Sequence, residues 1–267
     1  MKLTRSYSSD HVVAGNGTVS FACSTDVDEW PWLALGPRHP VVVQAQNFWT
    51  SIGASYALGS LSEEQWSALT WTEWAVGDPA AGLATRGTYG REERGDTDNF
   101  VISLFDDRER EVVTMRGRGV IFRNRNFEEW RQGSKREAAE VAHEPIAFVS
   151  RDTLGIGASE HPLVGLPQGD TVPALVSREN GLPPANPMLG GSGDHVNSVH
   201  MIEAARQALC VLDGESSRTF TGGEMQLNRY VELGTQFRLT PNQRGANNVT
   251  FTLEQLERPC AELRLRW

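Results

Sequence analysis

The chain has 267 residues and a formal charge of −9 at pH 7, and 39% of its residues are hydrophobic. This length suits one large domain or two of ordinary size. The acidic balance argues against duplex nucleic acid as the main partner, because phosphate binding needs a basic excess.

The three cysteines, Cys23, Cys210 and Cys260, are spaced too widely for a disulfide framework or a zinc motif. We therefore expect no bound metal and a reducing, cytoplasmic location. The first residues of the chain develop no signal-peptide core. Residues 40–62 carry no charge, but polar side chains such as Gln44 and Asn47 interrupt them. This stretch predicts a buried helix and no membrane span.

In the first half, the long uncharged segment predicts a helix at about 46–59. Strands are expected at 68–76, 83–91, 99–105 and 111–124. In the last of these, Val113 and Met115 alternate with Thr114 and Arg116, as in a strand with one buried face. A polar segment at 125–140 then indicates a linker that is helical in part.

The second half repeats this plan. We expect a strand near 145–150, a second long helix at 195–212 and further strands up to the C-terminus. Residues 249–254 and 261–267 alternate between apolar and polar side chains, which is typical of half-buried strands. Two units of long helix and antiparallel strands in tandem predict an α+β fold, with domains at 1–138 and 139–267.

The loop at 153–193 is unusual, because it contains eight glycines and six prolines. About forty residues without regular structure are rare in a compact domain unless they are functional or disordered. Its place before the second helix favours a lid or a pocket wall, and a disordered insertion is the alternative.

The second helix carries the candidate chemistry. Its apolar residues point in almost every direction, which predicts burial. On that background His200, Glu203 and Gln207 fall within one arc. A buried carboxylate needs a partner or a raised pKa, and general acid–base catalysis uses both. Asp194 is expected to cap the helix, whose free N–H groups would polarise a bound thioester carbonyl.

A structural role is the alternative for these residues. Asp194 would then be a cap alone, and Glu203 would pair with Arg206 or Arg229 to hold two elements together. For His200 the structural reading is the stronger one, and we treat it as a lining residue.

Two segments carry a family resemblance. Asp194-His195-Val196, followed by Glu203-Ala204-Ala205-Arg206-Gln207, resembles the central-helix motif of A-factor synthase (AfsA)-like proteins. Residues 228–233 are similar to the strand that those proteins place after the helix. The helix is also similar, more loosely, to the start of the helix in 4-hydroxybenzoyl-CoA thioesterase-type hotdog proteins. The resemblance is good over 193–239 and faint in the first half.

The resemblance implies a tandem double hotdog, in which a curved antiparallel sheet wraps each long helix. It also implies an acyl group carried on the phosphopantetheine of acyl carrier protein or on coenzyme A, with no other cofactor. The A-factor enzymes transfer a β-ketoacyl group to the hydroxyl of a small phosphorylated alcohol.

Two features depart from the family pattern. The first-half helix has no acidic residue, so the N-terminal hotdog is expected to be structural and non-catalytic. Asn197-Ser198 stands where the family has Pro-Gly, which leaves the acceptor and the reaction open.

These observations predict an acyltransferase of secondary metabolism that uses a small hydroxylated acceptor. Alternatives are a hotdog dehydratase or thioesterase, and a non-catalytic acyl- or butyrolactone-binding module. The expected protein is a pseudo-dimeric monomer or a homodimer. The expected catalytic residues are Glu203, His195 and Asp194, and the expected substrate-binding residues are Asn197, Ser198, His200, Arg206, Gln207 and Arg229.

Arginines form a cluster in this acidic chain, at positions 108, 110, 116, 118, 123, 125, 131 and 136. An acidic carrier protein or the phosphates of coenzyme A would be attracted to such a surface. An ordinary solvated strand face is the commoner explanation.

Overall fold

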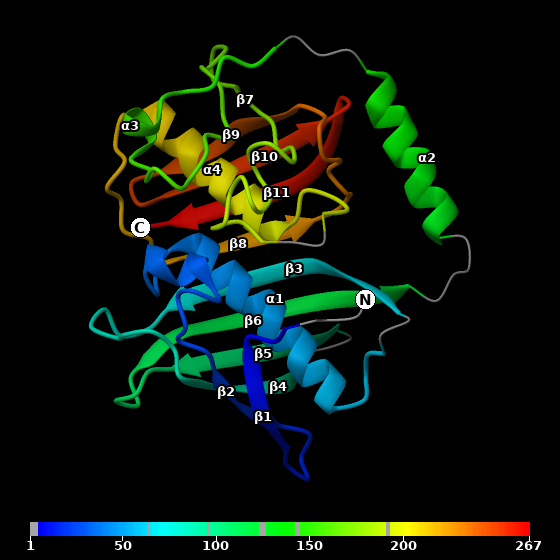
Figure 1. The fold of residues 1–267 in the computed structure, drawn as a ribbon, viewed down its shortest axis with the longest axis vertical. Coiled ribbons are helices and arrows are strands. Elements are labelled where there is room, and N and C mark those ends of the chain that lie inside the picture. Colours follow the sequence, from blue (N-terminus) through cyan, green and yellow to red (C-terminus); the bar gives the residue numbers. More distant parts are fainter. Residues whose placement is uncertain (1–4, 63–64, 95–96, 123–126, 142–144, 191–192) are drawn as a thin grey trace. The chain divides into compact units, whose positions relative to one another are not determined.

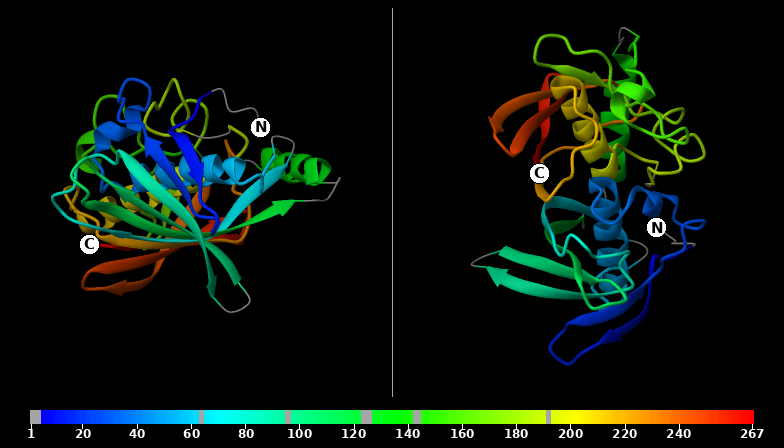
Figure 2. Two further views of the ribbon diagram at one scale, coloured as in Figure 1. Left: turned by 90° about the horizontal axis from the view of Figure 1, so that it is seen from below. Right: turned by 90° about the vertical axis from the view of Figure 1, so that its left-hand side faces the viewer.

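The computed structural model describes residues 5–62, 65–94, 97–122, 127–141, 145–190 and 193–267. It forms two compact units. The first contains Met1–Arg123 and Phe220–Glu224, and the second contains Asn124–Thr219 and Met225–Trp267. In each unit one long helix lies along one face of an antiparallel sheet (Figures 1 and 2).

The first unit has six strands in the order β1-β2-β4-β5-β6-β3. Its elements are β1 (Ser8–Val13), β2 (Val19–Cys23), the short 3-10 helix η1 (Pro31–Leu35), α1 (Pro40–Ala57), β3 (Trp66–Val76), β4 (Arg86–Arg94), β5 (Thr97–Phe105) and β6 (Glu111–Phe122). The four strands predicted from the sequence correspond to β3–β6, and the predicted helix corresponds to α1.

Helix α1 begins at Pro40, earlier than predicted, because proline at the first helical position needs no N–H partner. The His39 ring accepts a hydrogen bond from Val41 N at 3.3 Å and caps the helix. Polar side chains on α1 are buried in the unit, and Asn47 Nδ2 donates to Thr72 Oγ1 of β3 at 2.9 Å. The helix is therefore an interior element, as its lack of charge indicated.

The second unit has strands in the order β8-β11-β10-β9-β7. Its elements are α2 (Phe127–Glu140), α3 (Arg151–Leu154), β7 (Val172–Ala174), α4 (Ser198–Asp213), β8 (Gly222–Leu227), β9 (Phe237–Gly245), β10 (Asn248–Gln255) and β11 (Arg258–Arg266). The first half of β8, up to Glu224, is counted with the first unit. The alternating residues Phe251 and Leu253 of β10, and Leu263 and Leu265 of β11, are fully buried. The prediction of two half-buried strands here is confirmed.

Two predicted strands in this unit are wrong. Near 145–150 the structure has only an isolated bridge between Phe148 and Gly165. At 228–233 it has only a bridge between Val231 and Val196. This second bridge joins the segment to the residues just before α4. The segment therefore lies beside the start of that helix instead of extending the sheet.

Helix α2 is a structural part of the second unit, although its polar sequence indicated a linker. Arg131, Ser134, Lys135 and Ala138 follow the i, i+3, i+4, i+7 spacing of one helix face. Arg131 and Ala138 are buried. The boundary between the units consequently lies before α2, whereas the sequence placed it after residue 138.

The glycine- and proline-rich segment before α4 is folded over the part that the structure describes, residues 153–190 and 193. Leu163, Val164 and Leu189 are buried, and α3 contacts α4. Asn180 Nδ2 donates to the carbonyl oxygens of Leu175 and Pro162, which ties the segment together. The segment is therefore ordered and packed into the second unit. Gly191 and Ser192 lie outside the described residues.

Among the described residues, no helix has the length and apolar character that crossing a lipid bilayer requires.

Candidate functional site

The N-terminus of α4 is capped by Asn197. Its side-chain oxygen accepts hydrogen bonds from Val199 N at 3.0 Å and His200 N at 3.4 Å, and the His200 ring accepts one from Asn197 N at 3.2 Å. The predicted cap, Asp194, is therefore wrong, because the helix starts only at Ser198. The cap also uses two of the N–H groups that the sequence assigned to a thioester carbonyl.

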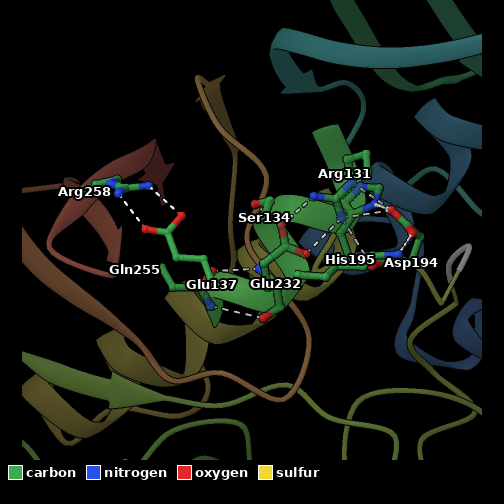
Figure 3. Close-up of polar contacts among 9 residues, drawn as sticks. Arg131, Ser134, Glu137, Asp194, His195, Glu232, Gln255 and Arg258 are labelled. Atoms are coloured by element: carbon green, nitrogen blue, oxygen red, sulfur yellow. Dashed lines mark hydrogen bonds and ion pairs between the residues drawn. The ribbon is translucent and has the colours of Figure 1, made fainter. Parts of the chain in front are cut away.

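Asp194 instead binds two cations of α2 (Figure 3). Its Oδ2 accepts from Arg131 Nη2 at 3.0 Å, and its Oδ1 is in contact with Lys135 Nζ. The same Oδ2 lies 3.3 Å from His195 Nδ1. The hydrogen bond with His195, followed by those with Lys135 and Arg131, lowers the pKa of Asp194 well below its usual range. Asp194 is thus an anion with a fixed orientation.

Arg131 joins Asp194 to a second buried carboxylate, Glu232. Its Nη2 donates to Glu232 Oε2 at 2.9 Å and its Nη1 to Oε1. Ser134 Oγ also donates to Oε1, at 2.7 Å. Gln255 bonds to the backbone N–H and the backbone carbonyl of Glu232 (Figure 3). The network thus connects α2, the start of α4 and the end of β10.

His195 is a member of this cluster that reaches solvent, since 24% of its side chain is exposed. An ionised Asp194 can only accept, so Nδ1 of His195 carries the proton and Nε2 is left as a base. The Tyr230 ring meets the imidazole edge to face, with 4.6 Å between ring centroids. No hydrogen bond to Nε2 is recorded among the described residues. A partly exposed base with a fixed orientation follows from this geometry.

His200 has a different environment. It is completely buried, and its Nε2 donates to the carbonyl oxygen of Gly181 at 2.8 Å. Burial lowers the pKa of His200 to about 4, so the ring is neutral at pH 7. Because backbone groups occupy both ring nitrogens, this geometry gives no support to the predicted substrate-binding role.

Glu203, Arg206 and Gln207 form a second buried network deeper along α4. Arg206 holds the Glu203 carboxylate with two hydrogen bonds of 2.8 and 2.7 Å, and Gln207 Nε2 donates to it at 2.8 Å. Gln207 Oε1 accepts from Leu163 N at 2.7 Å. Burial alone would lower the pKa of Arg206, but Glu203 raises it above its ordinary value. The structure therefore pairs Glu203 with Arg206, one of the two partners considered under the structural alternative.

A cavity of about 340 Å³ opens beside the first network. Its wall includes Tyr230, Glu232 and the exposed Arg229, and one face of α2 forms another side. Tyr230 lines this cavity, and its ring also contacts His195. The cavity and the surroundings of His195 therefore have this ring in common. Its volume is within the range of small-molecule sites.

The structure brings some predicted residues together and separates others. Asp194, His195, Asn197 and Ser198 lie around the start of α4, while Arg229 lies at the cavity. Glu203, Arg206 and Gln207 are in the deeper network. Sequence reasoning missed Arg131, Lys135, Tyr230 and Glu232 as members of the site. For the two α2 residues no signal was visible in the sequence, because α2 has few apolar residues and its ionic partners lie far away in the chain.

Comparison with protein-family models found no match, and comparison with curated proteins also found none. Solved structures are similar in fold. An acyl-ACP thioesterase from Bacteroides thetaiotaomicron VPI-5482 is 12% identical, with a TM-score of 0.55 over 94% of this chain and 96% of that one. The 12:0-ACP thioesterase from Umbellularia californica is also 12% identical, with a TM-score of 0.52 over 85% and 88%.

A bifunctional dehydratase-cyclase domain in ambruticin biosynthesis is 15% identical, with a TM-score of 0.52 over 98% of this chain and 95% of that chain. At such identities the likeness shows the fold, and it confirms the predicted tandem double hotdog.

Proposed function

We propose that this protein acts on an acyl thioester and transfers the acyl group to a small hydroxylated acceptor. The observation that carries the proposal is the Asp194–His195 pair, which is partly exposed at the N-terminus of the long helix of a hotdog unit. A cavity shares the Tyr230 ring with His195. His195 is not among the residues that line the cavity, so the proposal requires a thioester that extends past the Tyr230 ring to the imidazole.

In the proposed step, His195 Nε2 takes the proton of the acceptor hydroxyl as the oxygen attacks the thioester carbonyl carbon. The C–S bond breaks, and the leaving thiolate takes the proton back from the imidazolium. The products are an ester and the free thiol of the carrier. Asp194 holds the required tautomer and stabilises the imidazolium, as the acid member of a catalytic triad does.

The carbonyl oxygen needs a hydrogen-bond donor in this step. Asn197 already occupies the N–H groups of Val199 and His200. The structure records no bond from the Ser198 N–H to any described residue. We assign the contact with the carbonyl oxygen to Ser198.

Glu203 was the other candidate base. Its carboxylate is buried and already accepts three hydrogen bonds, two from Arg206 and one from Gln207. A hydroxyl would have to displace these donors to reach it. The geometry therefore favours His195 as the base and a structural role for Glu203.

The acyl donor in this proposal is acyl carrier protein or acyl-CoA, and the resemblance to AfsA-like proteins supports both the donor and the transfer. The two thioesterases of similar fold are named for acyl-ACP substrates.

Arg116 and Arg118 belong to the cluster that the sequence offered for carrier docking, and both lie on the first unit. Arg118 lies over the Trp71 ring at 5.9 Å, whereas Arg116 pairs with Glu92 at 3.2 Å. Arg123 and Arg125 of the same cluster lie outside the described residues.

Thioester hydrolysis is the second candidate function. It uses the same base, with water in place of the acceptor hydroxyl, and the exposed fraction of His195 gives water access. The chemical difference from transfer is a free acid product instead of an ester.

The test is incubation of the purified protein with acyl-CoA and with acyl carrier protein, with and without a panel of small alcohols, followed by mass spectrometry. Transfer predicts an ester that appears only with an acceptor. Free acid formed at the same rate without any acceptor would establish hydrolysis instead. Unchanged thioester under all conditions would contradict both.

A further inference from the structure

Helix α2 contributes a buried arginine to the candidate site, although no sequence pattern connected this helix with catalysis. Its Arg131 is buried, and 63 positions of sequence separate it from Asp194. Burying a guanidinium is unfavourable unless it is fully paired. Arg131 meets this condition with two carboxylates, Asp194 and Glu232. Both of these bonds end in the candidate site.

Arg131 contacts both groups that hold His195. Its Nη2 and the Nδ1 of His195 share one atom, Oδ2 of Asp194, at 3.0 and 3.3 Å. Its guanidinium carbon also lies 4.3 Å from the centroid of the Tyr230 ring. The Tyr230 ring therefore contacts both His195 and the arginine.

The partners of Arg131 are themselves held in place by further contacts. Glu232 accepts from Ser134 as well as from Arg131, and its backbone is fixed by Gln255. Lys135 occupies the other oxygen of Asp194. Asp194 consequently cannot rotate away from His195 without breaking contacts with two cations.

From these contacts we infer that Arg131 is a positioning residue for His195, acting through Asp194 and Tyr230. This inference rests on the proposed role of His195 and extends it to α2. Arg131 touches neither the thioester nor the acceptor in this assignment. It fixes the direction of the imidazole through the Asp194 Oδ2 atom that both side chains contact.

The charged and titratable groups around His195 come from three segments. They are Arg131 and Lys135 of α2, Asp194 and His200 of the α4 terminus, and Tyr230 and Glu232 of the segment after β8. Among them, Arg131 is the buried cation that bonds to the same oxygen as His195. Its loss should therefore stabilise the protonated imidazole.

The test compares Arg131→Gln and Arg131→Lys with Arg136→Gln, an exposed arginine of the same helix. For Arg131→Gln we expect kcat to fall by about 10- to 100-fold, as for a misplaced catalytic group. KM for the thioester should change little, because Arg131 does not bind it. The acid limb of the pH profile of kcat/KM should move up by about one pH unit. Arg131→Lys should keep the position of that limb and recover part of kcat.

Loss of one member of a buried ion pair also destabilises the fold. A lower melting temperature therefore does not distinguish a positioning role of Arg131 from a structural one. If Arg131→Gln does not fold, the double variant Arg131→Gln/Glu232→Gln removes both buried charges and takes its place. Wild-type kcat and a wild-type pH profile in the folded variant would overturn the inference.

A second measurement does not depend on activity. The titration of His195 can be followed by NMR on histidine-labelled protein, with His195→Gln to assign the signal. A higher titration midpoint in Arg131→Gln supports the inference even if the wild-type protein turns over no thioester. A different outcome is normal turnover of the thioester by the wild type, with the same kinetics and the same His195 titration midpoint in Arg131→Gln. This result would reject the role of Arg131 and leave the proposed role of His195 intact.

Discussion

His200 shows how burial fixes the role of a titratable residue. Its ring accepts from Asn197 N and donates to the carbonyl oxygen of Gly181, so it joins the cap of α4 to the segment that precedes it. Burial lowers its pKa to about 4. Protonation would remove the acceptor that Asn197 N requires, so the folded protein binds a proton at His200 more weakly than the unfolded chain does.

This difference predicts a pH dependence of stability. The unfolded chain protonates His200 near its ordinary pKa of about 6.5, so the contribution is complete above that pH and decreases as the pH falls toward 4. The loss sums to about 3 kcal/mol. Urea unfolding at pH 7, 6 and 5 should show this decrease in the wild type and in His161→Gln. In His200→Gln, which keeps a donor for Gly181, the decrease should be smaller. Parallel curves for all three proteins would contradict the prediction.

Glu203→Gln separates a structural ion pair from a catalytic base. The substitution leaves the buried Arg206 without its counter-ion, so the free energy of unfolding should fall by about 3 kcal/mol. Turnover per folded molecule should stay near that of the wild type. The exposed Glu262→Gln on β11 is the control and should change stability by less than about 0.5 kcal/mol. A stable Glu203→Gln variant with strongly reduced kcat would instead identify Glu203 as the base.

The sequence placed Asp194, His195 and Glu203 together because helical spacing is visible in it. In the structure α4 starts at Ser198, so of these three residues only Glu203 lies on the helix. The sequence could not show that Asp194 binds Arg131, since nothing local specifies a partner 63 positions away. The choice between Arg206 and Arg229 as partner of Glu203 also needed coordinates.

The cap of α4 gives a prediction for the whole element. Asn197→Ala removes the acceptor for Val199 N and His200 N and should lower the free energy of unfolding by about 1 kcal/mol, within a usual range of about 0.5–2. Asn197→Asp keeps the acceptor and loses only the hydrogen bond to the Gly190 carbonyl, so it should lie closer to the wild type. Equal stability of the alanine variant and the wild type in chemical unfolding would show that the cap is unimportant.

Helices and strands whose apolar residues recur with a clear period were predicted well. Elements made mostly of polar residues were not. Strands β10 and β11 alternate between buried and exposed residues, so their positions could be read directly. Helix α2 has few apolar residues, and its buried face depends on ion pairs that a hydrophobic pattern does not reveal. The segment at 145–150 has the composition of a strand but pairs only at Phe148.

At the scale of the molecule, two repeats of a long helix with alternating strands predicted an α+β fold in two units, and the resemblance to AfsA-like proteins implied the double hotdog. The reaction does not follow from this fold, because thioesterases and a dehydratase-cyclase domain share it. Activity is set instead by the side chains of the site. In this chain the partly exposed His195 bonds to Asp194 and contacts Tyr230, which lines a cavity.

The most direct test of the proposed chemistry is kcat of His195→Gln with the thioester and acceptor that the wild type uses. Loss of a general base predicts a decrease of about 10²–10⁴-fold. The melting temperature should be unchanged, because the side chain is partly exposed and its ring nitrogens bond only to Asp194 among the described residues. His161→Gln in the same unit should keep full activity. If folded His195→Gln turns over at the wild-type rate, His195 is not the base and the proposed mechanism is wrong.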